Sequence, residues 1–310
     1  DTLVKRTPKD TSITFLITEG LPVRLDSLTI LGLDSVAKPG AVTQDLPLRP
    51  GDPFNRILLD ATSDTLVRRL RDRGYPDAIA FQSFERDKSE LAASAAIELQ
   101  TGPLSGVSGI GISGTKRISP DVVRSLLATR PGQQFSQEEL YRSQRNLYRS
   151  ELFSFAAVSI DSAAYDPASD SVPLSVRVTE SKPRRARGSV GDATEDCLRL
   201  GAGVTFRDFA GHGQILDVSR RLSKIGVGSP TDWGMEEGFL CSQLEPDTLG
   251  SSEVNYRLAV SLRRPAFLSP HNTLSTTVFA DRRSDYLVYL RQEVGAGSDR
   301  VHRGDDLIRG

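Results

Sequence analysis

The sequence contains the same short motif twice, and each copy stands just ahead of a helical pattern. Arg-Pro-Gly-x-x-Phe occupies Arg49–Phe54 and again Arg130–Phe135, an offset of 81 residues. Self-similarity at a fixed period means that one supersecondary unit is built more than once. The repeat constrains the fold more than any other feature, because both copies must use the motif at the same place in the unit.

Each motif is followed by an amphipathic helix. After the first motif, apolar residues recur at multiples of four and form one stripe: Phe54, Leu58, Leu66 and Leu70. After the second, Ser136 and Glu139 have the spacing of a capping box. An earlier helix of the second copy is predicted to begin at Pro120, because proline suits the first helical turn. The motif is therefore predicted to be the turn of a helix pair, with Gly51 and Gly132 as the C-terminal stops of the earlier helices.

A short strand opens each copy and two strands close it. Alternating apolar residues predict the opening strands near Leu28–Gly32 and Ile110–Gly114. The closing strands are predicted at Ala78–Glu85, Leu91–Gln100, Phe155–Ser162 and Val172–Thr179. The final strand of a third, earlier copy is predicted at Ile13, Phe15 and Ile17. The predicted unit is therefore β-α-α-β-β.

Beyond Pro183 the helical period vanishes and apolar residues alternate with polar ones. The alternating stretches are Leu198–Phe206, Val254–Leu262, Leu274–Val278 and Tyr286–Leu290. A helix would spread these residues around its whole surface, whereas a strand puts them on one face. About five or six such strands fit after Arg184. The pattern is typical of a transmembrane β-barrel, and a soluble antiparallel sheet uses the same alternation.

Composition and motifs predict no enzyme. The net charge of −1 provides no field that would gather nucleic acid, and the basic run Lys182–Arg187 is interpreted as a solvated linker. The sequence contains no run of ~18 apolar residues, so it predicts no transmembrane helix. The two cysteines and three histidines lack the spacing of metal ligands, and Gly201–Gly203 lacks the third glycine of a dinucleotide loop. We expect no catalytic residue, no cofactor site and no metal site.

The repeated unit resembles a known domain family. Its Arg-Pro-Gly-x-x-Phe motif, with LRDRGYPDAIA at Leu70–Ala80 and LYRSELFSFAAV at Leu147–Val158, resembles a POTRA domain. Two such units followed by GSVGDATEDCLRLGAGVTFRDFAGHG and LRRPAFLSPHNTLS resemble the Omp85 superfamily of outer-membrane proteins, which includes the BamA and TamA types. The resemblance implies α+β POTRA repeats followed by an antiparallel transmembrane β-barrel, of which this chain covers only a part.

The resemblance also implies the domain boundaries. Residues 1–20 would hold the last strand of a preceding POTRA domain, residues 21–102 and 103–182 two POTRA domains, and residues 183–310 the N-terminal strands of the barrel. Phe206–Gly213 and Arg264–Asn272 would be short periplasmic turns, and Gly226–Ser252 a long extracellular loop. The implied location is the bacterial outer membrane, with the POTRA domains in the periplasm.

The function implied by the resemblance is insertion of β-barrel proteins into the outer membrane by strand pairing. In each POTRA unit, the strand after the second helix is expected at a sheet edge, where an extended client can add a strand. The edge residues expected to pair with clients are Ala78, Ala80, Gln82, Ala156, Val158 and Ile160. The implied partners are unfolded outer-membrane proteins, periplasmic chaperones or assembly lipoproteins, and outer-membrane lipid, but not nucleic acid.

The first strand after the second POTRA unit is expected to be the seam of the barrel. The seam residues are Arg187, Gly188, Ser189, Val190 and Gly191. Two glycines and few large apolar side chains predict weak pairing and a poorly fixed register. The other interpretation is that the glycines only relieve crowding inside the barrel. A secretion pore of the same superfamily, and a soluble periplasmic POTRA adaptor or scaffold, stay open as alternative functions.

The barrel interpretation also implies a disulfide. It puts Cys197 and Cys241 on the same outer side of the membrane, in an oxidising space. We therefore predict that the two cysteines are bonded; the alternative is two free, half-buried thiols.

Overall fold

The structure is a computed structural model, and it describes residues 2–6, 11–15, 21–87, 89, 91–193, 197–234, 253–285 and 289–302. The chain divides into two compact units. The first comprises residues 1–106 with the short segments 134–137 and 166–170, and the second comprises the remainder. At the start of the chain, β1 (Thr2–Arg6) and β2 (Thr11–Phe15) form an antiparallel pair. β2 contains the predicted strand residues Ile13 and Phe15, and Ile17 lies outside the described residues.

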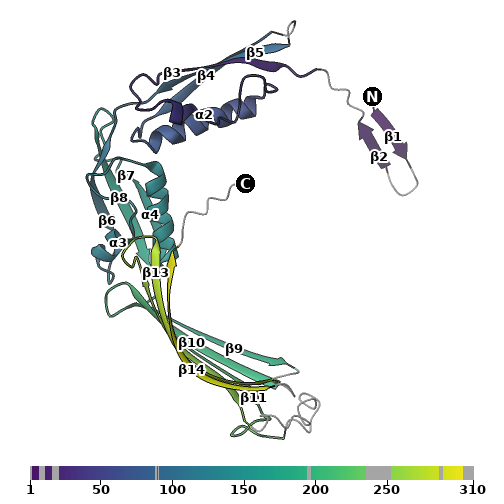
Figure 1. The fold of residues 1–310 in the computed structure, drawn as a ribbon, viewed down its shortest axis with the longest axis vertical. Coiled ribbons are helices and arrows are strands. Elements are labelled where there is room, and N and C mark those ends of the chain that lie inside the picture. Colours follow the sequence, from purple (N-terminus) through teal and green to yellow (C-terminus); the bar gives the residue numbers. More distant parts are fainter. Residues whose placement is uncertain are drawn as a thin grey trace. The chain divides into compact units, whose positions relative to one another are not determined.

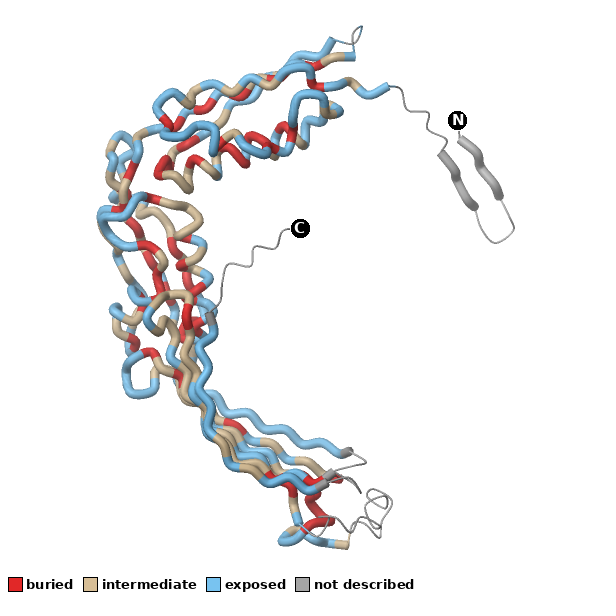
Figure 2. The backbone as a smooth tube through the Cα atoms, in the orientation of Figure 1, coloured by how far each residue is buried: buried red, intermediate tan, exposed pale blue. Residues whose placement is uncertain are grey.

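The first copy of the repeat is a three-stranded sheet covered by one long helix (Figure 1). Its elements are β3 (Arg24–Leu31), α1 (Gly40–Thr43), α2 (Arg56–Arg71), β4 (Ile79–Asp87) and β5 (Ala92–Gln100). The sheet order is β3-β5-β4, with β3 parallel and β4 antiparallel to β5. Of the predicted stripe, Leu66 and Leu70 are fully buried, and Phe54 and Leu58 are partly buried against the same core. Leu59, which the predicted stripe did not include, is also fully buried. Figure 2 shows this buried stripe along the helix.

The second copy repeats this arrangement. Its elements are β6 (Gly106–Ser113), α3 (Pro120–Leu126), α4 (Gln137–Arg149), β7 (Phe153–Ile160) and β8 (Ser171–Glu180), and its sheet order is β6-β8-β7. α3 begins at Pro120 as predicted, after Ser119, whose side chain caps the helix. α4 begins directly after Ser136, the predicted N-cap. Buried and less buried residues alternate along β8, as the period of two predicts.

The repeated motif has a different role from the one predicted. Gly51 and Gly132 both have positive φ, at 93° and 83°, but α1 ends at Thr43 and α3 at Leu126. The two glycines are therefore not C-terminal stops of helices, and that prediction was wrong. Instead, the segments 49–54 and 130–135, here called the elbows, run antiparallel to the start of the first strand of each copy.

The hydrogen bonds of the two elbows match bond for bond. In the first copy the bonds run from Gly51 N–H to the Leu25 carbonyl (2.7 Å), Leu25 N–H to Asp52 (2.9 Å) and Phe54 N–H to Val23 (2.8 Å). In the second they run from Gly132 N–H to Val107 (2.8 Å), Val107 N–H to Gln133 (2.8 Å) and Phe135 N–H to Ser105 (3.0 Å). The motif is repeated because each copy uses it to cover part of one edge of its own sheet.

The third sheet is a six-stranded antiparallel meander. Its strands are β9 (Arg184–Ala193), β10 (Cys197–Phe209), β11 (Gln214–Ile225), β12 (Asn255–Pro265), β13 (Asn272–Asp285) and β14 (Tyr289–His302). They lie in the order β14-β13-β12-β11-β10-β9, so within the described residues β9 and β14 are the two edges. The predicted turns Phe206–Gly213 and Arg264–Asn272 both contain a strand-to-strand connection. Tyr286 and most of Gly226–Ser252 lie outside the described residues.

The helices of the described residues are short or amphipathic. None of them is both long enough and apolar enough to cross a membrane.

Candidate functional site

In each of the two POTRA-like sheets, the start of one edge strand is covered, and the other edge strand has no further partner strand among the described residues. The elbows pair with the start of β3 and of β6, which are the first strands of the two sheets. β4 and β7 lie at the opposite edges, next to β5 and β8 respectively. Among the described residues, no strand pairs with the outer side of β4 or β7. Both strands expected at an edge are therefore at one, and each edge strand carries unpaired backbone groups.

The hydrogen-bond pattern shows which residues of β7 face outward. Val158 is the Cα partner of Val176, but its N–H donates to Gln144 Oε1 of α4 at 3.5 Å. Asp161 N–H, in contrast, donates inward to Pro173 at 2.8 Å. Because backbone groups alternate along an antiparallel strand, Ala156 and Ile160 share the outward direction of Val158. The three residues predicted from the sequence thus lie in phase on the open edge.

The residues predicted in the first copy are less uniform. Ala78 lies one residue before β4, is fully buried, and donates its N–H to Tyr75 at 3.2 Å. Ala80 and Gln82 lie within β4, and Gln82 Oε1 accepts a hydrogen bond from Ser63 of α2 at 3.2 Å. Phe81 is exposed beside the edge. Within this group, only Ala80 and Gln82 are strand residues that can offer backbone groups to an added strand.

The predicted seam forms most of β9. Arg187, Gly188, Ser189, Val190 and Gly191 pair in an unbroken register with Gly203, Ala202, Gly201, Leu200 and Arg199 of β10. All five seam residues are exposed. The pairing therefore has a single register in the structure, but it gains little from side-chain burial on this strand.

The glycines of β9 and β10 differ in the space around them. A Cβ added at Gly203 would lie 2.7 Å from Arg187 Nε, and one at Gly201 would lie 2.4 Å from Ser189 Oγ. At Gly188 only one atom lies within 4 Å, at 3.9 Å, and at Gly191 the described residues leave open space. A side chain at Gly201 or Gly203 would therefore require the Ser189 or Arg187 side chain to shift, whereas one at Gly188 or Gly191 would displace no described atom.

One face of the six-stranded sheet is apolar and exposed. Strand register puts Leu200, Val218, Val260 and Val278 on the same face, and each is exposed. Val190 and Val294 are exposed to 79% and 80%. The opposite face carries Asp217, Ser219, Arg221 and Arg257 at the alternating positions. Arg220 lies on the same face, between Ala202 and Leu258. The many exposed apolar side chains around it indicate contact with another apolar surface.

An ion cluster lies where the second POTRA-like copy meets the six-stranded sheet. Arg263 of β12 donates to Glu151 through both Nη1 (2.8 Å) and Nη2 (3.4 Å), and Nη2 also lies 2.9 Å from Asp217 Oδ2. Asp217 Oδ1 in turn accepts from Thr205 Oγ1 at 2.6 Å. The hydrogen bond from Arg263 outweighs partial burial and lowers the pKa of Glu151. The cluster joins α4's end to two strands through charge-assisted bonds.

Few groups in the described residues suggest bond chemistry. No set of three or more His, Cys, Asp or Glu side chains there could hold a metal ion. Cys197 is buried and disulfide-bonded, and Cys241 lies outside the described residues, so the predicted pairing of the two stays a prediction.

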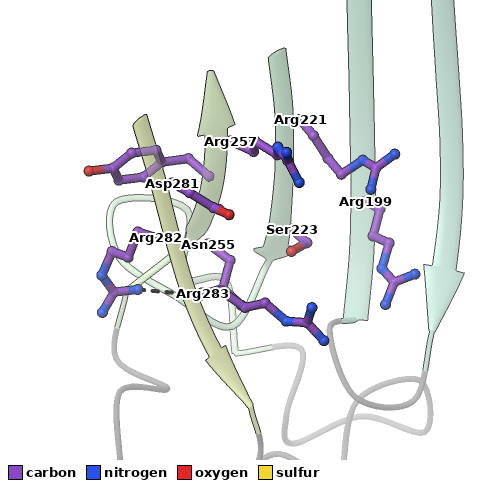
Figure 3. Close-up of a pocket in the computed structure, with 9 residues that line it drawn as sticks. Arg199, Arg221, Ser223, Asn255, Arg257, Asp281, Arg282 and Arg283 are labelled. Atoms are coloured by element: carbon purple, nitrogen blue, oxygen red, sulfur yellow. Dashed lines mark hydrogen bonds between the residues drawn. The ribbon is translucent and has the colours of Figure 1, made fainter. Parts of the chain in front are cut away.

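Sequence reasoning missed two features of this region. The first is the Glu151–Arg263 contact, which joins residues 112 positions apart. The second is a group of arginines on the polar face of the sheet, drawn in Figure 3: Arg199, Arg221, Arg257 and Arg283. Each of these arginines stands at a polar position of a strand in which apolar and polar residues alternate, so the sequence contained a signal for the second feature.

Comparisons with known proteins agree with this geometry. The model of the POTRA family, described as the surface antigen variable number repeat, matches residues 106–181. A Treponema pallidum protein whose name assigns it to outer membrane protein assembly is 23% identical over 242 residues, which are 73% of this chain and 28% of that protein. BamA from Haemophilus ducreyi lacking POTRA domains 1–3 has the same fold, with a TM-score of 0.62 at 15% identity, over 89% of this chain and 47% of that structure.

Residues 106–181 are thus a POTRA domain, and the first copy has the same element order and the same elbow bonds. Over most of its length, the chain shares the fold of the BamA structure. It spans less than a third of its curated relative and about half of the BamA structure.

Proposed function

We propose that the protein of which this chain is part inserts β-barrel proteins into the bacterial outer membrane. Client segments add as extra strands to the open edges of β4 and β7 and then to β9. The observation that carries the proposal is the position of β4 and β7: each is an edge strand with no further partner strand among the described residues, whereas the elbows pair with the start of β3 and β6. Unpaired N–H and C=O groups on a strand edge are the template for β-augmentation.

The six-stranded sheet is the N-terminal part of a membrane-spanning barrel in this proposal. The exposed apolar face would then meet the hydrocarbon, and the polar face would line the lumen. An open sheet edge is not stable in lipid, so β9 must find a partner there, either a strand of the same protein or a client. The proposed location is the outer membrane, with the domains at residues 21–102 and 103–182 in the periplasm and the barrel beginning at residue 183.

The low side-chain burial of β9 supports its role as the seam. Backbone bonds alone hold most of this strand to β10, since its described side chains from residues 184 to 192 are exposed. A client strand could therefore replace a neighbour of β9 without disrupting a packed core. Periplasmic chaperones or assembly lipoproteins are the proposed partners that would deliver clients to β4 and β7.

A proline pair in β7 tests the proposal. Val158→Pro removes an outward N–H, so the sheet should keep its ladder while client pairing is lost. Ala157→Pro removes an N–H that faces β8 and should unfold the domain instead. The measurement is client insertion in cells depleted of the wild-type protein, together with circular dichroism of both variants. Folded Val158→Pro protein with normal insertion would contradict pairing at β7.

The alternatives predict other outcomes. A secretion pore would export one partner protein and leave barrel insertion unchanged in the depleted cells. A water-soluble adaptor would partition into the aqueous phase of a detergent separation, despite the exposed valines and leucines of its sheet.

A further inference from the structure

We propose that the first copy of the repeat carries a docking surface for a further POTRA-like copy that precedes it in the full-length protein. The surface, here called the leading face, consists of Leu21, Pro22, Val23, Pro53 and Leu91. Its occupant is the turn that follows the second helix of the preceding copy, here called the exit turn. In the first copy the exit turn is Arg73–Gly74, directly after the C-cap of α2. The docking surface does not require the insertion role proposed above.

The exit turn of the first copy is bound by the start of the second copy. Ser105 N–H donates to the Gly74 carbonyl at 2.7 Å, and Gln134 Nε2 donates to the Arg73 carbonyl at 2.5 Å. Gly74 has a φ of 92°, and a Cβ added there would lie 2.7 Å from both Leu104 Cδ1 and Gln134 Nε2. Leu104, Ser105 and Gln134 therefore hold the exit turn through two hydrogen bonds and close packing.

Backbone hydrogen bonds identify the counterparts of these three residues in the first copy. Val23 and Ser105 each accept a hydrogen bond from the phenylalanine of their own elbow, at 2.8 Å and 3.0 Å. In each copy, the next residue pairs with the elbow position just before that phenylalanine, which is Pro53 in the first copy and Gln134 in the second. The counterparts of Leu104, Ser105 and Gln134 are therefore Pro22, Val23 and Pro53.

The leading face is open in the part of the chain that the structure describes. Among those residues, the Val23 N–H has no hydrogen-bond partner, although its counterpart at Ser105 bonds to Gly74. Leu21 is 79% exposed, and Pro22 and Pro53 are exposed as well. Leu21 and Pro22 line a hollow of about 490 Å³ together with Leu91. An open backbone donor beside exposed apolar side chains indicates a surface that another part of a protein covers.

The division of the chain into compact units supports the same surface. Segments 134–137 and 166–170 of the second copy belong to the compact unit of the first copy. Asp170 and Leu91 accept corresponding backbone hydrogen bonds, at 2.8 Å and 2.9 Å. Leu91 and Pro53 are therefore the counterparts of residues that group with the copy before their own.

The exit turn of the second copy also contacts the module that follows it. The turn after α4 includes Glu151, which has a positive φ of 61°, as Gly74 does after α2. Glu151 accepts two hydrogen bonds from Arg263 of the six-stranded sheet. In both copies the exit turn therefore docks on the next module. This repeated use identifies the exit turn of a preceding copy as the occupant of the leading face.

The sequence just before the leading face matches the connection between the two copies. Glu19–Leu21 stands where Thr101–Pro103 stands in the second copy, with glycine at the same position. β5 ends at Gln100 and β6 begins at Gly106, and a connection this short spans roughly 20 Å at most. Copies joined in this way must touch, so a preceding copy with the same connection would lie within reach of the leading face.

Site-specific photocrosslinking in the full-length protein tests the docking. A benzoylphenylalanine in place of Leu104 is the matched positive control and should crosslink to Arg73–Gly74. The same probe in place of Pro22 should crosslink, within one molecule, to a peptide that lies N-terminal to Asp1 and follows a helix. A probe in place of Asp64, which is exposed on α2, is the negative control and should give no such product.

Two crosslinking results would overturn the proposal. The first is a product at Pro22 with a second molecule of this protein, with a client or with any other protein. The second is no product at Pro22 beside a clear product at Leu104. If neither probe reacts, the exchange rate of the Val23 amide decides.

Amide hydrogen exchange of the full-length protein gives that rate. If an exit turn accepts the Val23 N–H, this amide should exchange at least about tenfold more slowly than an unbonded amide, as the Ser105 amide should. Leu21→Glu introduces a charge into the leading face and should remove the protection of Val23, while unchanged protection of Ser105 shows that the protein is folded. Fast exchange at Val23 in the wild type, or equal protection of Val23 in both proteins, would contradict the docking.

Discussion

The edge strand β7 and the edge strand β9 are open in different ways. β7 has one face packed on a helix-covered core, with Ala156 and Val158 buried, and its outward backbone groups stand on a rigid support. β9 has exposed side chains along its described length and depends on backbone bonds to β10. The comparison shows that open edge strands differ in how firmly they are held. A strand with buried side chains stays in its sheet when another strand is added, whereas a strand with exposed side chains can separate from its neighbour. We expect clients to dock on β7 without changing it and to compete with neighbours at β9.

The largest expected effect tests whether side chains are packed more firmly in the POTRA domain than on β9. Leu147 of α4 is fully buried and Val190 of β9 is 79% exposed. Leu147→Ala should cost about 2–5 kcal/mol of the POTRA domain's unfolding free energy, through lost burial and a cavity. Val190→Ala should change the unfolding free energy by less than about 0.5 kcal/mol. Denaturant unfolding of the detergent-solubilised protein measures both, and equal costs would show that β9 is packed as firmly as the POTRA core.

A pair of glycine substitutions tests the seam itself. Gly203→Val would push against Arg187 and should cost about 1–3 kcal/mol by overpacking. Gly188→Val meets open space and should stabilise the β9–β10 pairing by up to about 1 kcal/mol, because valine favours a strand. If β9 must separate from a neighbour, Gly188→Val and Gly191→Val should impair client insertion despite intact folding. Unchanged insertion in depleted cells would remove the seam from the mechanism.

Part of the acid dependence of the second POTRA domain should come from Glu180. Burial alone would raise its pKa, but the N–H groups of Ile118, Lys116 and Arg117 and the Arg117 charge outweigh it and lower the pKa. A carboxyl with a lowered folded pKa stabilises the fold above its unfolded pKa, and this contribution is lost as pH falls through the folded value. Wild-type unfolding temperature should therefore drop below about pH 4.5.

Glu180→Gln separates this contribution from other acid effects. It should cost about 1–3 kcal/mol at neutral pH, because the loop at residues 116–118 loses a charged acceptor. The difference between the variant and the wild type should shrink as the pH is lowered. A difference independent of pH would show that the charge of Glu180 is not the cause.

The smallest expected effect concerns Gln144, whose side chain accepts the Val158 N–H at a long 3.5 Å. Gln144→Ala should change the unfolding free energy by no more than about 0.5 kcal/mol. It should nevertheless raise the crosslinking of clients to a photoreactive residue placed at Ser159, because the edge group is no longer occupied. Reduced crosslinking would mean that Gln144 helps clients to bind instead of competing with them.

Local features of the sequence predicted the local parts of the fold well. Proline at position 120 and serine at 136 mark the starts of α3 and α4, because caps depend on neighbouring residues only. The alternation of apolar and polar residues after Pro183 predicted strands, because this pattern also depends only on residues close together in the sequence. The POTRA assignment of the second copy, made from the repeat, is confirmed by the family match to residues 106–181.

Features that depend on register could not be predicted. A glycine with positive φ can end a helix or turn the chain alongside a strand. The sequence does not distinguish these two uses for the elbow glycines, because it does not show which strand their N–H groups will bond. The opposition of Arg221 and Arg257 follows from the pairing of β11 with β12, which no single strand specifies. The Glu151–Arg263 contact likewise needs two distant elements to be placed first.

Amide hydrogen exchange on β7 tests the central claim, that open strand edges capture clients, most directly. The full-length protein would be measured with and without a peptide copying the last strand of an outer-membrane barrel protein. We predict added protection at Ala156, Val158 and Ile160, and little change at Ala157 and Ser159, whose N–H groups already bond to β8. Protection of neither set, or of both equally, would contradict strand addition at this edge.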